Sequence, residues 1–407
     1  MQVEAKPYPV RRNALLLTAG LVCLSGMFQL AVALSTVTLV VVTGVEGILG
    51  LAPAIFLAAG ALAVAPAGRA MDRFGRMPVI QAGFAVGIAG SVVTGLGCSV
   101  RSGVVVVLGL GLAGASGAIV LLSRVAAAEM FPPERRARGI SLVLFGAVSG
   151  AVWGPLIFGP LFSGRALTSD SLVTPWLASG LFMVAGLVIS LFVRPDPKTI
   201  AATHPGDEQT VDAAPLRVIL RRPGVPTAFL GAVASFAGMV GVMNLSGYVA
   251  VGRHHHESDV FTIISAHIVG MYGLVLVVGD LVDRIGRRRS IVIGLAIMAA
   301  SNAALAGLSG LLGMSACLFG LGLGWNLSYV AATTELISLT SPSERGRLIG
   351  FTDLVSSLTG AGLALLGGVV YSGAGAGTLA AAAAALAVGP AVWIAVRSPG
   401  LRVATAG

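Results

Sequence analysis

Long apolar segments separated by short charged ones follow one another along almost the whole chain. A helix that crosses a bilayer needs about 20 mostly apolar residues, and segments of that length recur here. The pattern therefore predicts an all-α membrane protein with twelve transmembrane helices. We expect the first six at residues 13–41, 48–67, 77–99, 103–128, 139–163 and 174–193, and the second six at 224–250, 260–281, 290–309, 311–337, 347–371 and 376–397.

A polar stretch divides these segments into two sets of six. Residues 194–223 carry acidic and basic side chains throughout and are too polar to lie in hydrocarbon. We predict an N-terminal six-helix half at 1–193, a cytoplasmic linker at 194–223 and a C-terminal six-helix half at 224–407.

The basic residues collect on one side of the predicted membrane. Of the 26 Lys and Arg residues, 22 lie before the first helix, in alternate loops, in the linker or after the last helix. Only Arg101, Arg165 and Arg253 lie in the other loops, and Arg124 lies within the fourth helix. By the positive-inside rule, both termini are expected in the cytoplasm, with the protein in the cytoplasmic membrane.

The composition excludes several other classes of protein. With 56% hydrophobic and 11% charged residues, the chain could not keep the hydrated surface of a soluble domain. Its net charge of +9 is scattered between apolar segments, so we expect no binding to nucleic acid. The three cysteines lie in or beside apolar segments and indicate no disulfide framework.

One charged motif occurs twice, and the two copies lie 211 residues apart. The pattern G-x-x-x-D-R-x-G-R is formed first by Gly68, Asp72, Arg73, Gly75 and Arg76, and then by Gly279, Asp283, Arg284, Gly286 and Arg287. A second pair, Pro-x-Glu-Arg at 132–135 and 342–345, repeats at nearly the same offset. Two repeats in register indicate two related halves in parallel order.

This repeated motif resembles the signature loop of the major facilitator superfamily, and the resemblance covers the whole chain. It implies that the motif residues gate the cytoplasmic side. Glu129 and Arg136 match the glutamate-to-arginine spacing that the family has after helix 4. In the second half, Glu335 has Pro342 at the place of that arginine, which argues against a symmetric second lock.

Helix 5 contains Gly150, Gly154 and Pro155, followed by Gly159 and Pro160. This segment resembles an element of proton-coupled drug antiporters. Proline kinks a helix and glycine lets a neighbour approach, so a specialised contact between the halves is expected. The early part of helix 4 lacks the arginine of those antiporters, and a merely kinked packing helix is the alternative.

Polar side chains inside the membrane are costly and usually face the interior of the bundle. In the resembled family, helices 1, 4, 7 and 10 line the cavity, which makes four residues candidate substrate contacts: Gln29, Asn244, Trp325 and Asn326. The alternative for the amides is a hydrogen bond between helices. Arg124 is expected to reach the membrane surface, to pair with Glu129 or to attract an anionic substrate.

Two residues are candidates for proton coupling. Asp353 lies among apolar residues of helix 11, where the protonated carboxyl is favoured. Its alternative role is a lock with Arg73 or Arg347. His267 in helix 8 is the second candidate, since histidine titrates near neutral pH, and a neutral core histidine is its alternative.

The sequence thus predicts a secondary active transporter of a small solute, with proton-coupled efflux favoured. A metabolite uniporter or proton symporter is the alternative, ahead of a divalent-metal exporter or a sensor. The His254–His256 loop does not define a metal site, and no nucleophile and base pair indicates an enzyme. We expect a monomer in the lipid bilayer that binds substrate and protons and needs no metal or cofactor.

Overall fold

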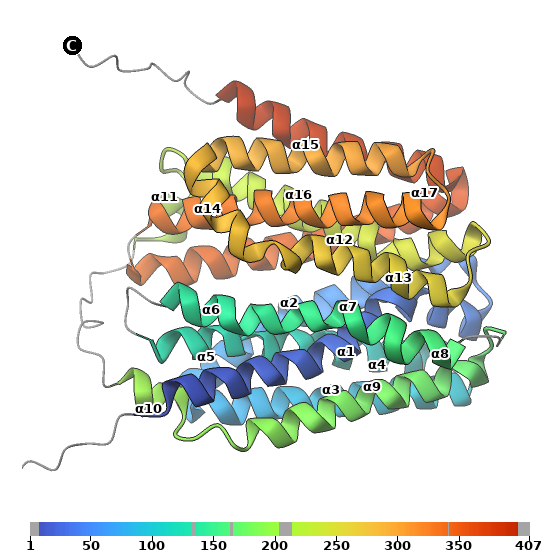
Figure 1. Cartoon of the computed structure of the whole chain (residues 1–407), viewed down its shortest axis with the longest axis horizontal. Coiled ribbons are helices and arrows are strands. Elements are labelled where there is room, and N and C mark those ends of the chain that lie inside the picture. Colours follow the sequence, from blue (N-terminus) through green and yellow to red (C-terminus); the bar gives the residue numbers. More distant parts are fainter. Residues whose placement is uncertain (1–7, 132–135, 163–165, 203–213, 341, 398–407) are drawn as a thin grey trace, which may run out of the picture.

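The computed structural model describes residues 8–131, 136–162, 166–202, 214–340 and 342–397. Its helices lie side by side in one elongated bundle, with the second set above the first in Figure 1. The first six predicted crossings are α1 (Val10–Thr43), α2 (Leu51–Phe74), α3 (Arg76–Ser99), α4 (Gly103–Leu121) with α5 (Ser123–Glu129), the run from α6 (Arg136–Phe145) through η3 (Gly146–Ser149), α7 (Gly150–Trp153) and η4 (Gly154–Phe158) to α8 (Gly159–Phe162), and α9 (Ser169–Ser190).

The second six crossings follow the same order. They are α12 (Val225–Gly252), the run of α13 (Glu257–Ile268), η5 (Val269–Gly273) and α14 (Val275–Ile285), then α15 (Arg287–Leu305), α16 (Leu311–Ser338) and two crossings within α17 (Pro342–Arg397). The backbone of α17 turns at Gly375, where φ is 78° and ψ is 178°, and this turn separates the last two crossings.

In the described residues, ten helical stretches are long and apolar enough to cross a membrane. One of them, residues 347–397, holds two crossings, and the interrupted α13–η5–α14 run supplies another. Together these give twelve, so the predicted all-α fold with twelve helices in two six-helix halves is confirmed. Short helices α10 (Pro197–Ala201) and α11 (Leu216–Ile219) lie between the halves in sequence.

The repeated motif lies largely on helices, although we had expected a loop. α2 continues to Phe74 and α3 begins at Arg76, so Gly75 alone makes the connection, with φ at 100°. Gly286 connects α14 to α15 in the same way, with φ at 91°. A turn of one residue with positive φ requires glycine, which explains why both copies of the motif carry it.

The two halves pack closely at one end of the bundle. We call the end with α10 and α11 the linker end and the opposite end the far end (Figure 1). Near the far end, a side chain on Gly247 of α12 would collide with the carbonyl of Ala33 in α1. Phe158 of η4 stacks there on Phe261 of α13, with ring centroids 5.9 Å apart. These contacts close the halves against each other at the far end.

Candidate functional site

A charged group joins the halves between the core and the linker end. Arg124 of α5 belongs to the first half, and its Nη2 lies 3.5 Å from Oδ2 of Asp353 in α17. The hydroxyl of Tyr329 in α16 donates a hydrogen bond of 2.8 Å to the other oxygen, Oδ1. The side chains of Arg124 and Asp353 remain 29% and 30% exposed, so water can reach both.

This pairing differs from each partner that the sequence suggested. α17 begins at Pro342, before the expected start at residue 347, so Asp353 lies about 16 Å along the helix at 1.5 Å per residue. At that depth it meets Arg124 of the other half. Arg347 instead donates to the carbonyl of Ala214 over 3.1 Å, and the guanidinium of Arg73 lies over the Phe74 ring.

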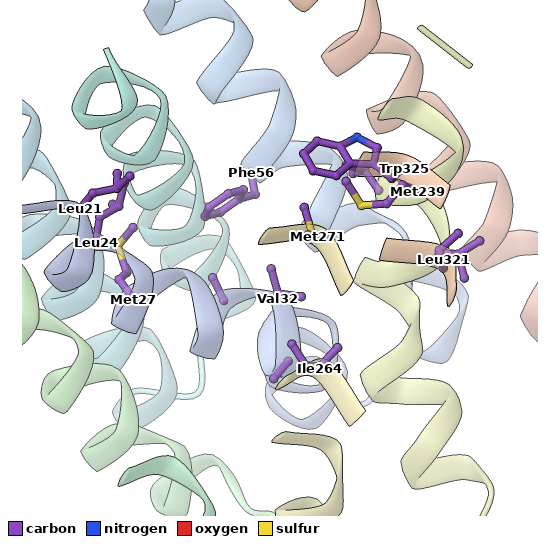
Figure 2. Packing of buried hydrophobic residues seen from close by; sticks show 14 of the residues in the cluster. Leu21, Leu24, Met27, Val32, Phe56, Met239, Ile264, Met271, Leu321 and Trp325 are labelled. Atoms are coloured by element: carbon purple, nitrogen blue, oxygen red, sulfur yellow. The ribbon is translucent and has the colours of Figure 1, made fainter. Parts of the chain in front are cut away.

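Tyr329, the hydrogen-bond partner of Asp353, belongs to a cluster of aromatic rings. Trp325 stacks on Tyr329 with ring centroids 5.2 Å apart, and Tyr272 of η5 meets the Trp325 ring edge-on at 5.9 Å. Phe236 of α12 also packs against Tyr329, with ring centroids 5.9 Å apart. In Figure 2, the Trp325 ring lies next to Met239. Thus helices 7, 8 and 10 each contribute a ring to this cluster.

Three of the predicted cavity residues are buried with polar groups that lack a partner among the described residues. They are the indole N–H of Trp325 and the side-chain amides of Gln29 and Asn326. Gln29 of α1 lies against helix 5 of its own half, because a side chain on Gly154 would collide with its amide nitrogen. Asn244 differs: its amide donates to the carbonyl of Val240 over 2.9 Å.

Two ion pairs occupy equivalent places at the linker end of the halves. Arg76 holds Glu129 at two points, 2.8 Å from Nε and 2.9 Å from Nη2. In the second half, Nη1 of Arg287 lies 3.3 Å from Glu335. The missing arginine at position 342 therefore does not remove the second pair, since the repeated motif itself supplies the arginine.

The other motif side chains are only partly accounted for. Arg284 is exposed, and a side chain on Gly68 or Gly279 would meet open space. The side chains of Asp72, Asp283 and Arg136 lie outside the described residues, so their proposed gating contacts stay predictions.

Sequence reasoning missed the role of Asp196. Its two carboxylate oxygens accept hydrogen bonds from the backbone N–H groups of Arg76 and Met77, at 3.1 and 2.8 Å. This residue of the linker therefore caps the first turn of α3, where unpaired N–H groups and the helix dipole favour an anion. The sequence did carry a signal, because Asp before Pro197 is a pattern typical of a helix start. That pattern indicates a cap for α10, which Asp196 directly precedes, and not for α3.

The helix 5 element lies against the other half. Gly150 lies close to Ile268 of α13, and Gly154 lies close to Phe261 of the same helix. Within their own half, the two glycines lie close to Ser25 and Gln29 of α1. Residues 154–158, which include Pro155, form a π-helical segment. The glycines thus allow close contact between the halves, while the antiport role suggested for this element stays a prediction.

His267 lies within the second half. Its side chain is fully buried, and its Nδ1–H donates a hydrogen bond of 2.7 Å to the carbonyl of Leu318 in α16. Its Nε2 has no partner in the described part of the chain. In the loop before α13, His255 lies 2.6 Å from the carbonyl of Ser309 and 3.9 Å from Asp259.

Comparisons with known proteins agree with this architecture. The model of the Major Facilitator Superfamily matches residues 15–361 and 251–406. The uncharacterized MFS-type transporter YddS of Bacillus subtilis is 29% identical over 339 residues, which cover 81% of this chain and 78% of that protein. The riboflavin transporter RfnT of Brucella anthropi is 25% identical over 300 residues, which cover 72% of this chain and 73% of that protein.

Among solved structures, the inward open conformation of the xylose transporter XylE from E. coli has a TM-score of 0.75 with this chain. It shares 16% identity, and the match covers 97% of this chain and 98% of the other. At that identity the likeness concerns the fold. Together with the family model and the bacterial relatives, it shows that this chain belongs to the Major Facilitator Superfamily, whose members are multi-pass membrane transporters that work by alternating access.

Proposed function

We propose that this chain is a proton-coupled carrier of a small organic solute, in which Asp353 binds the coupling proton. The observation that supports this is the ion pair between Asp353 and Arg124, which belong to opposite halves. A carboxylate that holds the halves together through an arginine can do so only while it is ionised. Proton binding to Asp353 therefore weakens a contact between the halves at the linker side of the core.

The surrounding groups determine how Asp353 responds to a proton. In the described residues it contacts Arg124 and the hydroxyl of Tyr329, and Tyr272 lies near the same arginine. The ionised carboxylate accepts a hydrogen bond from Tyr329, whereas the protonated carboxyl loses its attraction to the guanidinium. The site thus has two electrostatic states, which is what coupling of a proton to a conformational change requires.

Two directions of transport agree with this coupling. The helix 5 element, with Gly154 and Pro155 at the contact between the halves, supports export in exchange for protons. Arg124 beside the proton-binding carboxylate supports uptake with protons. Exchange against protons would need a cationic solute that competes with the proton for Asp353, and such a cation would have to displace the arginine. The Brucella relative is named a riboflavin transporter, and aromatic rings stack well on flat ring systems, so solutes with a flat ring are the first to assay.

The coupling role can be tested without knowledge of the solute. Cysteines at Phe74 and Ser338, which are exposed at the linker end of opposite halves, would carry spin labels. In the purified protein we expect the distance between the labels to change between about pH 8 and about pH 3, the range over which ordinary histidines and carboxyl groups become protonated. In Asp353→Asn, the distance should stay at its low-pH value at every pH.

Two controls make this test specific. Asp170→Asn removes the carboxylate of an exposed pair with Arg101 and should leave the pH response unchanged. If Asp353→Asn keeps the wild-type response, Asp353 does not couple protons to the movement. If His267→Gln loses the response instead, the coupling role passes to His267.

A further inference from the structure

We infer that the solute is an organic anion with a flat ring, and that it crosses together with one proton by taking the place of Asp353 on the Arg124 guanidinium. This inference rests on the proposed function, since it assumes that Asp353 takes up the proton. It is carried by three features of the site: the charge balance of the pair, the weak geometry of the contact and the donor-rich aromatic surroundings.

The charge balance decides in which states of occupancy the site can change from facing one side of the membrane to facing the other. With Asp353 ionised and no solute bound, the carboxylate neutralises Arg124. With Asp353 protonated and an anion bound to Arg124, the charges balance again. A proton alone leaves the arginine unpaired, and an anion alone places two negative charges beside one positive charge. Unpaired charge is costly once the site closes around it. The site therefore changes access when it is empty or when it holds both the anion and the proton.

The contact between Arg124 and Asp353 leaves room for a competing anion. It is made at one point, Nη2 to Oδ2, over 3.5 Å. Glu129 binds Arg76 at two points, 2.8 and 2.9 Å away, which is the strong geometry for a guanidinium and a carboxylate. Arg124 therefore has N–H groups that a carboxylate, sulfonate or phosphate group can bind at two points after Asp353 becomes protonated.

The rest of the site offers hydrogen-bond donors and flat apolar surfaces. The indole N–H of Trp325 is buried and has no partner among the described residues, and the hydroxyl of Tyr329 becomes available when Asp353 no longer needs it. Both donors suit the oxygens of an anion. The stacked rings of Trp325 and Tyr329, with Tyr272 edge-on, provide surfaces for an aromatic ring.

Binding to the purified protein tests the class of solute with three probes of nearly equal shape. They are 2-naphthalenesulfonate, the neutral 2-naphthalenesulfonamide and the cationic 2-naphthylmethylammonium. We expect the sulfonate to bind most tightly, and more tightly as the pH falls. Arg124→Gln should weaken sulfonate binding roughly 10- to 100-fold, the loss expected for hydrogen bonds to a charged group, and should leave any binding of the sulfonamide unchanged.

Transport into proteoliposomes tests the stoichiometry, because the permanently charged sulfonate does not cross lipid by itself. An inward proton gradient should drive its accumulation, and a membrane potential imposed with potassium and valinomycin should not, since one anion and one proton carry no net charge. Asp353→Asn should still exchange the sulfonate without accumulating it. Arg101→Gln, which removes an exposed cation at the far end, should behave as wild type.

Several outcomes would overturn the inference. Equal or tighter binding of the sulfonamide or the ammonium probe would exclude an anion, and so would binding of none of the three. Accumulation driven by the membrane potential would exclude one-to-one symport. If the spin-label distance still depends on pH through Asp353 while the sulfonate does not bind, the solute class is wrong and the coupling role of Asp353 stands. If Asp353→Asn keeps the wild-type pH response, the proposed function itself fails.

Discussion

The backbone N–H of Met77 donates a hydrogen bond of 2.8 Å to Oδ2 of Asp196, although the two residues lie 119 positions apart. The linker is thereby attached to the beginning of α3. The contact lies next to Arg76, whose side chain binds Glu129, and a Cβ on Gly75 would press against the Asp196 carboxylate. The absence of a side chain at Gly75 therefore leaves space for the cap as well as permitting the turn.

The first prediction concerns this cap. Replacing Asp196→Ala removes the acceptor of two backbone N–H groups of α3, and loss of a helix cap costs about 1 kcal/mol. We expect a lower unfolding temperature of the protein purified in detergent. Asp170→Ala, which removes an exposed carboxylate near the far end, is the matched control. Equal unfolding temperatures for the two variants would show that the cap contributes nothing to stability.

The second prediction ranks the two ion pairs at the linker end. Arg76 and Glu129 make a two-point contact with side chains 15% and 25% exposed, whereas Arg287 and Glu335 make one contact of 3.3 Å. Arg76→Gln should therefore destabilise the protein more than Arg287→Gln, by about 1 to 3 kcal/mol. Denaturant unfolding of both variants measures the difference. A larger loss in Arg287→Gln would reverse the ranking.

The third prediction concerns closure at the far end. Gly247→Val adds a side chain that collides with the Ala33 carbonyl of the other half, so the halves can no longer approach there. We expect cysteines at far-end positions to react faster with thiol reagents in this variant. Gly362→Ala adds a methyl group in open space on α17 and serves as the control. Unchanged reactivity in Gly247→Val would show that the helices accommodate the side chain by a local shift.

The fourth prediction concerns orientation in the membrane, which the distribution of Lys and Arg favours but which stays a prediction. Ala166 and Ala202 are exposed at the far end and at the linker end. In intact cells, an impermeant thiol reagent should label Ala166→Cys and leave Ala202→Cys unlabelled. The native cysteines Cys23, Cys98 and Cys317 are buried and should give little background. Labelling of Ala202→Cys alone would place the termini outside.

The sequence predicted the fold because hydrophobic length and the repeated motif are local properties of the chain. It could not predict the partner of Asp353, since Arg124 lies 229 positions away and only the packing of the two halves brings them together. Asp196 was missed for the same reason. Glu335 shows a different limit: its expected partner was sought at one fixed spacing, while the structure supplies Arg287 from another helix.

The described part of the chain has two π-helical segments, η4 in helix 5 and η5 in helix 8, and these helices face each other across the two halves. Such segments interrupt the regular backbone bonding of an α-helix and occur frequently at functional sites. Phe158 at the end of η4 and Phe261 in the helix before η5 already form a stacked contact between the halves. The parts of these two helices toward the far end are therefore joined by an aromatic contact, so opening of the halves there has to separate the two rings or move both helix ends together.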